Sequence, residues 1–511
     1  MSEPARQLTG LAALLGVPPD EAWSGVMIRG VAHDSRSVRR GDVYVALPGA
    51  RFHGADFAAQ AHARGAVALI ADPTGEERAR ASGLPVLVVP HPRERLGEVA
   101  AWVYGRPSDD LLLVGITGTN GKTTTAYLLE SGLRAAGHRS GLIGTVETRI
   151  GGDVVRSVHT TPEATDLQAL LAVMRERGVG AVAMEVSSHA LALDRVAGTT
   201  YDVAVFTNLS QDHLDFHADI EDYFHSKAGL FTAGYARAGV VNVDDHYGRV
   251  LADRAEIPVT TYSPSGDHVA DWRAEGCTPA PSGSGFVVVG PEAAAAAHVR
   301  LPGMVNVANA LAAIVAAVTA GVPLRAAVDG VAAVSGVPGR MEAVDAGQPY
   351  LALVDYAHTP DALETLLTGL RDVTRGRLSV VVGCGGDRDR TKRPLMGQVA
   401  ARCADLAVLT NDNPRSEDPQ LILAAMWEGA VSVPGGERAQ VVVEPDRAAA
   451  ISLAVARAGP GDTVVVAGKG HEQGQEVQGA VRPFDDHAVL RGAISRGARN
   501  GTRGRTPERK S

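Results

Sequence analysis

Short, almost continuous apolar segments recur along the chain and are separated by longer stretches with helical periodicity. Uninterrupted apolar strands of this kind are typical of a parallel sheet that helices cover on both faces. The segments form two series, at residues 111–116, 181–185, 202–207 and 239–243, and at 351–354, 378–382, 406–410 and 463–467. Helical stretches such as 360–370 and 447–457 alternate with them. The pattern predicts two doubly wound α/β units in succession.

The rest of the chain completes the predicted organisation. Before residue 109 the strands are short, as at 43–47 and 86–89, and an alanine-rich helix is expected at 57–64. Residues 263–299 are irregular, and we expect an antiparallel excursion there. The fold class is α/β in three domains: a small N-terminal α/β domain at 1–108, a central parallel-sheet domain at 109–337 and a C-terminal Rossmann-like, doubly wound domain at 338–490.

A glycine-rich loop lies between the first strand of the central domain and the start of a helix. Gly115, Gly118 and Gly121 precede Lys122. In such a loop the backbone N–H groups and the helix N-terminus bind phosphate oxygens, and the lysine adds a point charge at the β and γ phosphates. The strict pattern requires glycine where Ile116 stands, so we expect a variant nucleotide-binding loop and not an ordinary GTPase loop. The alternative is a glycine-rich turn with an exposed lysine.

Lysine is rare in this chain. Only five of the 49 basic residues are lysines, at positions 122, 227, 392, 469 and 510. Since arginine serves wherever a surface charge is sufficient, a remaining lysine indicates a need for a compact ammonium or for an amine that can lose its proton. Lys227 lies in a helical stretch and could pair with Glu221 or Asp222 on its surface. Its rarity favours a second interpretation, in which the neutral amine adds CO₂ to form a carbamate that supports Mg²⁺.

Two further segments follow predicted strands of the central domain. Glu185 ends a buried strand, so its carboxylate would emerge beside the phosphate loop, where a magnesium ligand is needed, if the two strands are neighbours. A carboxylate that caps the following turn is the alternative. The other segment, 208–217, fits either a metal or phosphate site or a hydrogen-bonded polar loop. It contains Asp212, His213, Asp215 and His217.

Polar clusters follow directly after the strands of the second apolar series. Ligands of doubly wound sheets bind at the carboxyl ends of the strands. The clusters are Asp355-Tyr356-Ala357-His358, Gly385-Gly386-Asp387-Arg388, Asn411-Asp412-Asn413-Pro414-Arg415 and Gly468-Lys469-Gly470-His471-Glu472. Since four strands end in this way, we expect a ligand site at this edge of the C-terminal domain.

Charge and composition exclude several classes of protein. The formal charge is −9, and residues 491–511 hold seven basic residues and one acid, so the remainder carries −15. An acidic body disfavours general nucleic-acid binding, and the Gly- and Arg-rich tail 491–511 is expected to be disordered. Neither a signal peptide nor a membrane span is expected, which predicts a cytoplasmic protein. Cys277, Cys384 and Cys403 lack the spacing of a disulfide framework or a zinc site.

Taken together, these segments resemble the Mur ligases, the ATP-dependent enzymes that form amide bonds in peptidoglycan precursor synthesis. The resemblance covers about residues 25–490 and rests on motifs in the family's order. The motifs are Gly118-Thr119-Asn120-Gly121-Lys122-Thr123-Thr124, the Glu185 segment, Asp212-His213, Lys227, Asn306-Val307-Ala308-Asn309, Gly339-Arg340-Met341-Glu342 and Asp355-Tyr356-Ala357-His358-Thr359-Pro360.

The resemblance implies a role for each of these motifs. The loop from Gly118 to Thr124 would bind ATP, and Asn309 and Asp355 would contact its adenosine. Arg340 would approach the γ-phosphate. The catalytic set would be Lys122, Lys227, Glu185, His213 and Arg340, with Mg²⁺ held by Thr123, Glu185, His213 and a carboxylated Lys227.

The N-terminal domain is similar to the uridine-binding domain of the ligases that add the third residue of the stem peptide. The similarity lies in Asp34-Ser35-Arg36, Gly41-Asp42 and Ala46-Leu47-Pro48-Gly49. It implies that His33 and Ser35 lie at UDP, and that the muramoyl dipeptide is held by Thr160, Thr161, Ser187 and Arg195. Leu193 stands where some members have glutamine, and His159 where some have asparagine.

The amino-acid acceptor can be argued from charge. Diaminopimelate differs from lysine by a second carboxylate, and an arginine binds a carboxylate through two parallel hydrogen bonds while it repels an ammonium. Arg415 supplies that arginine, and it could alternatively cap a helix or pair with Glu417. LL- and meso-diaminopimelate present the same groups and both remain open. The resemblance implies a pocket of Arg388, Asp412, Asn413, Pro414, Arg415, Gly468 and Glu472.

The implied enzyme is an ADP-forming ligase that adds 2,6-diaminopimelate to the D-glutamate of UDP-N-acetylmuramoyl-L-alanyl-D-glutamate through an acyl phosphate. The alternatives are L-lysine as the acceptor, or an enzyme similar to the folylpolyglutamate synthetases. A nucleotide-dependent switch would leave the acceptor cluster unexplained. We expect a monomer that uses ATP and Mg²⁺ and has no nucleic-acid partner.

Overall fold

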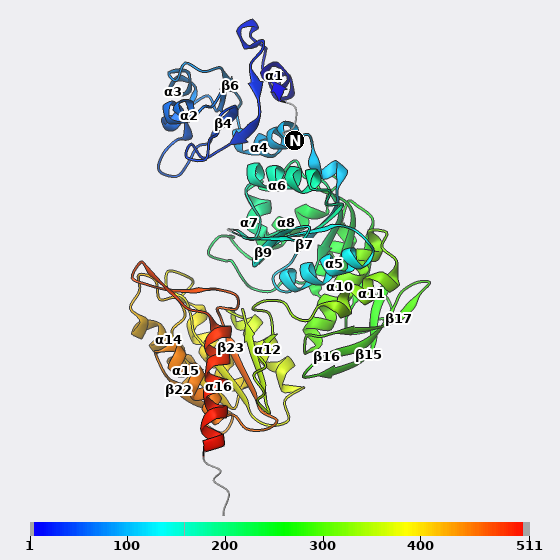
Figure 1. Ribbon diagram of the computed structural model, residues 1–511, viewed down its shortest axis with the longest axis vertical. Coiled ribbons are helices and arrows are strands. Elements are labelled where there is room, and N and C mark those ends of the chain that lie inside the picture. Colours follow the sequence, from blue (N-terminus) through cyan, green and yellow to red (C-terminus); the bar gives the residue numbers. More distant parts are fainter. Residues whose placement is uncertain (1–4, 158, 504–511) are drawn as a thin grey trace, which may run out of the picture.

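The computed structural model describes residues 5–157 and 159–503, with side chains up to residue 497. Within this part of the chain, three main sheets with their helices follow one another along the long axis, from the N-terminal to the C-terminal end (Figure 1). Every strand expected in the two apolar series is present. The predicted α/β class is therefore confirmed.

The N-terminal sheet is small and wholly parallel, with strand order β3-β4-β5-β6. Its middle strands are buried on both faces, which explains their apolar sequences. The expected helix at 57–64 is α2. The elements are β1 Arg6–Gln7, α1 Leu8–Leu15, β2 Met27–Ile28, β3 Gly30–Ala32, β4 Asp42–Ala46, α2 Ala58–Ala63, β5 Ala68–Ala71, α3 Glu76–Arg80, β6 Val86–Val88 and α4 Pro92–Val103.

The central sheet has a parallel middle, in the order β8-β11-β7-β12-β13-β14. Alternate side chains of β7 and β11 enter two separate cores, one with α5, α10 and α11 and the other with α6, α7 and α8 (Figure 1). The elements up to β12 are β7 Leu112–Thr117, α5 Lys122–Ala135, β8 Ser140–Ile143, β9 Glu147–Ile150, β10 Asp153–Arg156, α6 Ala164–Glu176, β11 Ala181–Glu185, α7 Ser188–Ala192 and β12 Tyr201–Phe206. The remainder are α8 Ile220–Ala228, β13 Ala236–Asn242, α9 His246–Arg254, β14 Val259–Ser263, β15 Trp272–Ala280, β16 Gly283–Val289, β17 Ala294–Val299, α10 Met304–Thr319 and α11 Leu324–Ala333.

Both edges of the central sheet carry antiparallel strands. β15, β16 and β17 pair antiparallel beyond β14, which confirms the excursion expected at 263–299. At the opposite edge β9 and β10 form a hairpin next to β8. The antiparallel strands thus cover both edges of the parallel part of the sheet, which includes β7, the strand that leads into the phosphate loop.

The C-terminal sheet has the order β18-β19-β23-β20-β21-β22 and is parallel from β19 onward. Because its strands run the same way, the polar clusters that follow β19, β20, β21 and β23 emerge at one edge. The elements are β18 Glu342–Ala343, β19 Leu351–Asp355, α12 Pro360–Arg371, β20 Leu378–Val382, α13 Lys392–Cys403, β21 Leu406–Leu409, α14 Pro419–Val431, β22 Gln440–Val443, α15 Arg447–Arg457, β23 Thr463–Ala467, β24 Gly474–Val477, β25 Ala480–Pro483 and α16 Asp486–Arg503.

The last helix corrects one expectation. Composition predicts disorder from residue 491, but α16 continues to Arg503. The prediction is wrong for 491–503 because Leu490, Ala493 and Ile494 recur at helical spacing and are buried in the core of the C-terminal domain. At its start, Asp486 forms an ion pair of 2.7 Å with Arg447, and both side chains are completely buried. Residues 504–511 lie outside the described residues.

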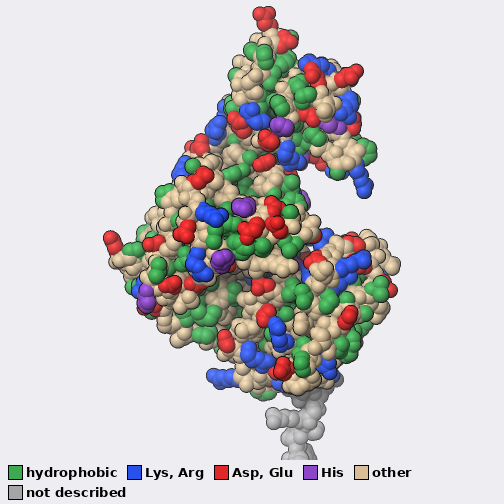
Figure 2. Space-filling view, turned by 180° about the vertical axis from the view of Figure 1, so that it is seen from behind, with side chains coloured by type: hydrophobic (Ala, Val, Ile, Leu, Met, Phe, Trp, Pro, Cys, Tyr) green, Lys and Arg blue, Asp and Glu red, His purple; other side chains and the backbone are tan. Residues whose placement is uncertain are grey.

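Two surface properties complete the description. In residues 5–157 and 159–503, no helix has the length and apolar character needed to cross a membrane. On the face shown in Figure 2, acidic and basic side chains of the described residues are interspersed, and the surface is indented between the N-terminal domain and the C-terminal domain.

Candidate active site

The phosphate loop joins β7 to α5, and its glycines lie where no side chain fits. Gly118 and Gly121 have φ of +146° and +89°. A Cβ at Gly118 would collide with Oγ1 of Thr207, and one at Gly121 would collide with Oδ1 of Asn309. The unusual glycine spacing therefore follows from the side chains that pack against this loop.

Two lysine side chains meet at one carbonyl oxygen of the loop. Nζ of Lys122 lies 2.7 Å from the carbonyl oxygen of Gly118, and Nζ of Lys227 lies 2.9 Å from the same atom. Lys227 is only 1% exposed. Its burial, together with the charge of Lys122, lowers the pKa of Lys227 well below its ordinary value. Because two ammonium groups this close repel each other, this geometry favours a neutral amine at the buried Lys227.

The surface pairing considered for Lys227 does not occur. Glu221 accepts a hydrogen bond from the hydroxyl of Tyr247, and Asp222 lies 3.3 Å from His217. The Lys227 side chain instead turns inward, with Nζ 4.4 Å from the centre of the Tyr223 ring. That alternative is therefore wrong.

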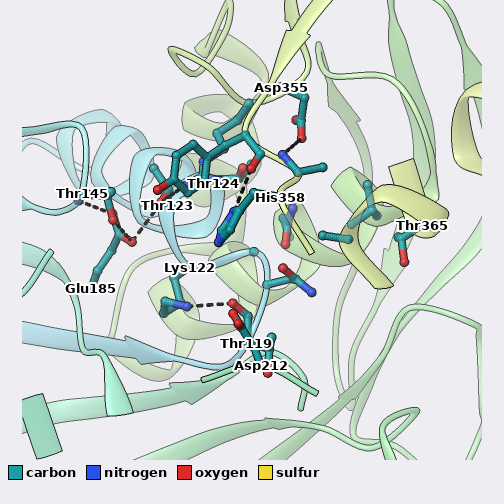
Figure 3. Close-up of a pocket in the computed structure, with 18 of the residues that line it drawn as sticks. Thr119, Lys122, Thr123, Thr124, Thr145, Glu185, Asp212, Asp355, His358 and Thr365 are labelled. Carbon is teal, nitrogen blue, oxygen red and sulfur yellow. Dashed lines mark hydrogen bonds between the residues drawn. The ribbon is translucent and has the colours of Figure 1, made fainter. Parts of the chain in front are cut away.

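Glu185 faces the phosphate loop because β11, which it ends, lies next to β7. β11 pairs with β7 so that Glu185 lies opposite Ile116. Its Oε2 accepts hydrogen bonds from Oγ1 of Thr123 at 2.9 Å and from Oγ1 of Thr145 at 3.0 Å (Figure 3). The carboxylate thus does not cap its own following turn. The sequence interpretation missed Thr145, which the apolar segment of β8 could have indicated.

One part of the polar segment 208–217 fits a hydrogen-bonded loop, and another part fits a metal or phosphate site. His217 is buried and satisfied, with Nε2 3.0 Å from Oγ of Ser188. Asp212 and His213 line the cavity at the phosphate loop, hereafter the phosphate-loop cavity. Burial lowers the pKa of His213 to about 4, so its imidazole is neutral at physiological pH and able to bind a metal. In the part of the chain described, no group of three or more His, Cys, Asp or Glu side chains forms a preassembled metal site.

The residues expected at the nucleotide line the same cavity from several elements. Asn309 lies on α10 beside Asn306, to which its amide donates at 3.1 Å. Asp355 accepts the N–H groups of Met341 and Ala357, each at 2.7 Å, and burial raises its pKa. Figure 3 shows Asp355 and His358 across the cavity from Glu185. The structure therefore brings strand ends of two domains to one cavity.

Arg340 connects the two domains at this point. Its Nη2 donates to Oγ1 of Thr123 at 3.1 Å, and its guanidinium lies 4.5 Å from the centre of the Tyr356 ring. Its Nε is buried without a hydrogen-bond partner among the described residues. An orphaned donor beside the phosphate loop fits an anionic ligand.

A second cavity, hereafter the C-terminal cavity, lies at the polar edge of the C-terminal sheet. All but one of the residues expected to bind the acceptor line it, and only Pro414 does not. Among them, Asn413 donates to Oε2 of Glu472 at 2.8 Å. The residues that line it are Arg388, Asp412, Asn413, Arg415, Gly468 and Glu472.

The hairpin β24–β25 fixes the position of Arg415. The N–H of Arg415 donates to the carbonyl of Glu476 at 3.0 Å, and its Nε lies 3.6 Å from the Glu476 carboxylate. Gln475 donates to the carbonyl of Asp412 at 2.8 Å. Glu417, the alternative partner, instead pairs with Arg393 at 2.8 Å. No hydrophobic pattern in the sequence indicates this hairpin, so Gln475 and Glu476 were not among the expected site residues.

The residues expected at the UDP and muramoyl groups are more dispersed. Thr160 and Ser187 line the phosphate-loop cavity, whereas Thr161 is buried and donates to the main chain of Glu185 at 2.9 Å. His33 and Ser35 lie in the N-terminal domain and line neither cavity. Nδ1 of His33 lies 3.0 Å from Oγ1 of Thr165, and Ser35 donates to Gln60 at 2.7 Å.

Arg195 also lies outside both cavities. Its Nε is 2.8 Å from Oε1 of Glu163, whose other oxygen lies 2.9 Å from Arg93 on α4. Arg195 is thus part of the contact between the N-terminal and central domains.

The two cavities share a wall. Asp212 and His213 from the central domain and Tyr356 and His358 from the C-terminal domain line both of them. A phosphate donor in the first cavity and an amine in the second would therefore lie on the two sides of these four side chains.

Three family models match the chain in succession. The Mur ligase family catalytic domain matches residues 27–104, the Mur ligase middle domain matches 116–317, and the Mur ligase glutamate ligase domain matches 339–470.

Among curated relatives, proteins named UDP-N-acetylmuramoyl-L-alanyl-D-glutamate–2,6-diaminopimelate ligase are similar over nearly the whole chain. The protein of Streptomyces avermitilis is 61% identical over 491 residues, which is 96% of each chain. That of Corynebacterium glutamicum is 49% identical and covers 93% of this chain and 94% of its own. A solved structure of the same name is 34% identical with a TM-score of 0.69 and covers 97% and 99% of the two chains. The MurF ligase of Thermotoga maritima in complex with ADP, 19% identical with a TM-score of 0.63 over 94% and 100%, shares the fold.

Proposed function

The chain belongs to the Mur ligase family, and we propose that it joins 2,6-diaminopimelate to the D-glutamate of UDP-N-acetylmuramoyl-L-alanyl-D-glutamate, with conversion of ATP to ADP and phosphate. Relatives that are 61% identical over 96% of the chain carry this activity in their names. The resemblance inferred from the motifs is thus confirmed. Because the proposed reaction consumes ATP and a UDP-linked precursor, we propose that it takes place in the cytoplasm.

One observation carries the proposal, namely the wall that the phosphate-loop cavity and the C-terminal cavity share. A ligase of this type must bring a phosphoryl donor, a carboxylate and an amine to one point. Asp212 and His358, which come from different domains, line both cavities. The acyl phosphate would therefore form within reach of the amine.

In the first step the terminal carboxylate of the glutamyl group attacks the γ-phosphorus of ATP, and ADP leaves. The loop N–H groups and Lys122 hold the β and γ phosphates, and Arg340 offsets charge on the transferring phosphoryl group. Without ATP, Nζ of Lys122 donates to the carbonyls of Gly118 and Thr119, at 2.7 and 2.8 Å. When ATP binds, Nζ would donate to phosphate oxygens instead.

The donor set fits Mg²⁺. Thr123 and Glu185 offer hard oxygen ligands in mutual contact, and His213 lines the same cavity with a neutral imidazole. When bound, Mg²⁺ would neutralise phosphate charge during the transfer. These residues and Lys227 would hold it.

Lys227 is suited to carry a carbamate. A neutral amine adds CO₂ and releases one proton, so an uncharged group becomes an anion. The anion would attract the Lys122 ammonium at the Gly118 carbonyl, whereas a protonated Lys227 would repel it. It would also supply an anionic oxygen ligand beside the phosphate loop.

In the second step the acceptor amine attacks the acyl carbon, phosphate leaves and the amine loses a proton. Arg415 would bind the distal carboxylate of diaminopimelate, which lysine lacks. Its Nη1 donates to the carbonyl of Gly386 at 2.7 Å and its Nε lies 3.6 Å from the Glu476 carboxylate, so the guanidinium is placed before the acceptor binds.

The test measures phosphate release from ATP and Mg²⁺ in the presence of the UDP-linked dipeptide, without an acceptor, with each diaminopimelate isomer and with L-lysine. We expect release that depends on diaminopimelate and a product with the matching mass. Release with lysine alone would retain the family but overturn the acceptor, and acceptor-independent release would indicate a hydrolytic switch.

The carbamate has its own test. Activity should fall in CO₂-free buffer and return when bicarbonate is added. An activity that does not respond to CO₂ would exclude this role for Lys227 and leave the ligase activity unaffected. Sedimentation at working concentration tests whether the enzyme is the expected monomer.

A further inference from the structure

One member of the rare lysine set has no place in the chemistry proposed so far. Lys469 follows β23 and is 0% exposed. Its Nζ donates to Oδ1 of Asn413 at 3.0 Å and to Oε2 of Glu472 at 2.9 Å. Both partners line the C-terminal cavity, whereas Lys469 itself does not. A fully buried cation thus lies directly behind two residues of the expected acceptor pocket.

The backbone on both sides of Lys469 is closely packed. Gly468 and Gly470 flank it, with φ of +114° and +54°. A Cβ at Gly470 would lie 2.8 Å from the Tyr356 side chain, and one at Gly468 would lie 2.8 Å from Oδ2 of Asp412. An ammonium fits behind such a turn, and a planar guanidinium is larger and requires several acceptors in its plane. This explains why the position holds one of five lysines in an arginine-rich chain.

Lys469 sets the direction in which the Asn413 amide faces. Oδ1 of Asn413 accepts from Lys469 and from the N–H of Glu476, each at 3.0 Å, while Nδ2 donates to Glu472 at 2.8 Å. If the amide were reversed, donors would face donors on one side and two acceptors would meet on the other. The network is therefore satisfied in one arrangement only.

The two oxygens of Glu472 differ as a result. Oε2 accepts from both Lys469 and Asn413. Oε1 has no hydrogen-bond partner within the described residues. The side chain is 34% exposed and lines the C-terminal cavity and also a neighbouring cavity that includes Thr160. A carboxylate that is held by one oxygen leaves the other oxygen able to bind an ammonium group of an amino acid.

We propose that Lys469 is a positioning residue for the acceptor: its buried ammonium holds Oε2 of Glu472 and orients Asn413, so that Oε1 of Glu472 binds an ammonium group of diaminopimelate. Lys469 contacts no substrate. The inference rests on the proposed function and adds to it a residue that acts through Glu472.

The competing explanation is that Lys469 only compensates buried polar groups. A double-mutant cycle in the full chain separates the two, with the variants Lys469→Met, Glu472→Gln and the double variant. The KM values for diaminopimelate, ATP and the UDP-linked dipeptide are measured for each. Methionine retains the length of the side chain and removes the charge.

We expect Lys469→Met to raise the KM for diaminopimelate about 10- to 100-fold, by analogy with the loss of a partner that orients a metal-binding residue. The other two KM values should stay within about twofold, because the phosphate-loop cavity does not include this network. If Lys469 acts through Glu472, the double variant should resemble the more impaired single variant. An unchanged KM for diaminopimelate, or effects that multiply in the double variant, would overturn the proposal.

Lys469→Met can also fail to fold, since it leaves Glu472 and Asn413 without their buried partner. The comparison of Glu472→Gln with the double variant then decides. The double variant removes both charges of the pair, and in Glu472→Gln the amide oxygen can still accept from Lys469. Equal KM values for diaminopimelate support the proposal, and a further rise in the double variant refutes it.

Two controls accompany the cycle. Arg325→Met removes a positive charge from the Arg325–Asp329 pair on α11, where Arg325 is 79% exposed, and should leave all KM values unchanged. Wild-type enzyme is assayed in parallel. If its phosphate release does not depend on diaminopimelate, the proposed function fails; if it does and the cycle shows no coupling, only the role of Lys469 fails.

Discussion

Lys227 and Lys469 are equally buried, at 1% and 0% exposure, but their surroundings are opposite. Around Lys227 lie a carbonyl oxygen, an aromatic ring and the charge of Lys122. Around Lys469 lie a carboxylate and an amide oxygen. Burial alone therefore does not determine the electrostatic surroundings of a lysine; its partners do.

The same contrast separates the two regions of the site. At the phosphate loop, Arg340 has a buried Nε without a partner in the described chain, and Lys122 contacts only loop carbonyls. In the C-terminal domain, Lys469 pairs with Glu472, and Arg447 pairs with Asp486. The cations of the first region are thus arranged to receive anionic ligands, whereas Lys469 and Arg447 in the second region already have carboxylate partners before the acceptor binds.

The largest effect is expected from Lys227→Met. If Lys227 carries an anion in the active enzyme, its loss should lower kcat about 10²- to 10³-fold, the range for removal of one electrostatic group from a transition state. The KM for diaminopimelate should change little. Steady-state kinetics with each substrate in excess checks this prediction, and a variant with half the wild-type kcat would contradict it.

Arg415→Lys tests the region of the site in the C-terminal domain. The substitution retains the charge but loses the two parallel hydrogen bonds to a carboxylate, so the KM for diaminopimelate should rise about 10- to 100-fold while the KM for ATP stays constant. Arg390→Lys is the matched control, since Arg390 is 74% exposed and pairs with Glu417 at 3.1 Å. An equal effect of both substitutions would show that Arg415 has no special role.

The two buried lysines should also differ in the sign of their effect on stability. Lys469→Met leaves buried acceptors unsatisfied and should lower the free energy of unfolding by about 1–3 kcal/mol. Burial lowers the pKa of Lys227 in the folded protein, which favours the neutral amine there, whereas the unfolded amine is protonated at pH 7. Lys227→Met should therefore raise the free energy of unfolding at pH 7.

The gain in stability expected for Lys227→Met has a defined pH dependence. Unfolded Lys227 binds a proton that the folded state lacks, so wild-type stability rises with pH until the unfolded lysine deprotonates near its ordinary pKa of about 10.4. The advantage of Lys227→Met should therefore shrink between pH 7 and pH 10. Urea denaturation at both pH values, without nucleotide or Mg²⁺, measures it. Shifts of the same sign for both lysines would remove the contrast between them.

The smallest effect is expected where the two regions meet. Asp361, in the first turn of α12, accepts hydrogen bonds from Oγ of Ser210 at 2.7 Å and from Nδ2 of Asn120 at 3.3 Å. Asp361→Asn should raise the KM for ATP about three- to tenfold, since a single net hydrogen bond contributes about 0.5–1.5 kcal/mol. A larger rise in the KM for diaminopimelate than in that for ATP would argue against this assignment.

The sequence predicted the strands and the strand-end motifs well, because buried parallel strands and the polar residues after them are local patterns. Glu185 is the clearest case, since its place depends only on β11 lying next to β7. The loop glycines were also recognisable, although the contacts of Gly118 and Gly121 with Thr207 and Asn309 explain their spacing only afterwards.

Other features depend on contacts between distant segments. Lys122 and Lys227 converge on the carbonyl oxygen of Gly118 although 109 residues separate Gly118 from Lys227. The strand β25 is exposed at every position, so it has no hydrophobic pattern to reveal it. The helix α16 was missed because its Gly and Arg content concealed three buried apolar residues. The roles of the individual site residues stay predictions until the variants are measured.

The shared wall between the two cavities has a consequence for inhibition. A molecule that joins a phosphate-like group to an amino-acid group would span both cavities past Asp212 and His358. Once one half is bound, the other half is present at an effective concentration in the millimolar range for a short linker. Two weakly binding fragments could therefore combine into one tight inhibitor, and the linker length that gives the strongest inhibition would measure the distance between the two reaction centres.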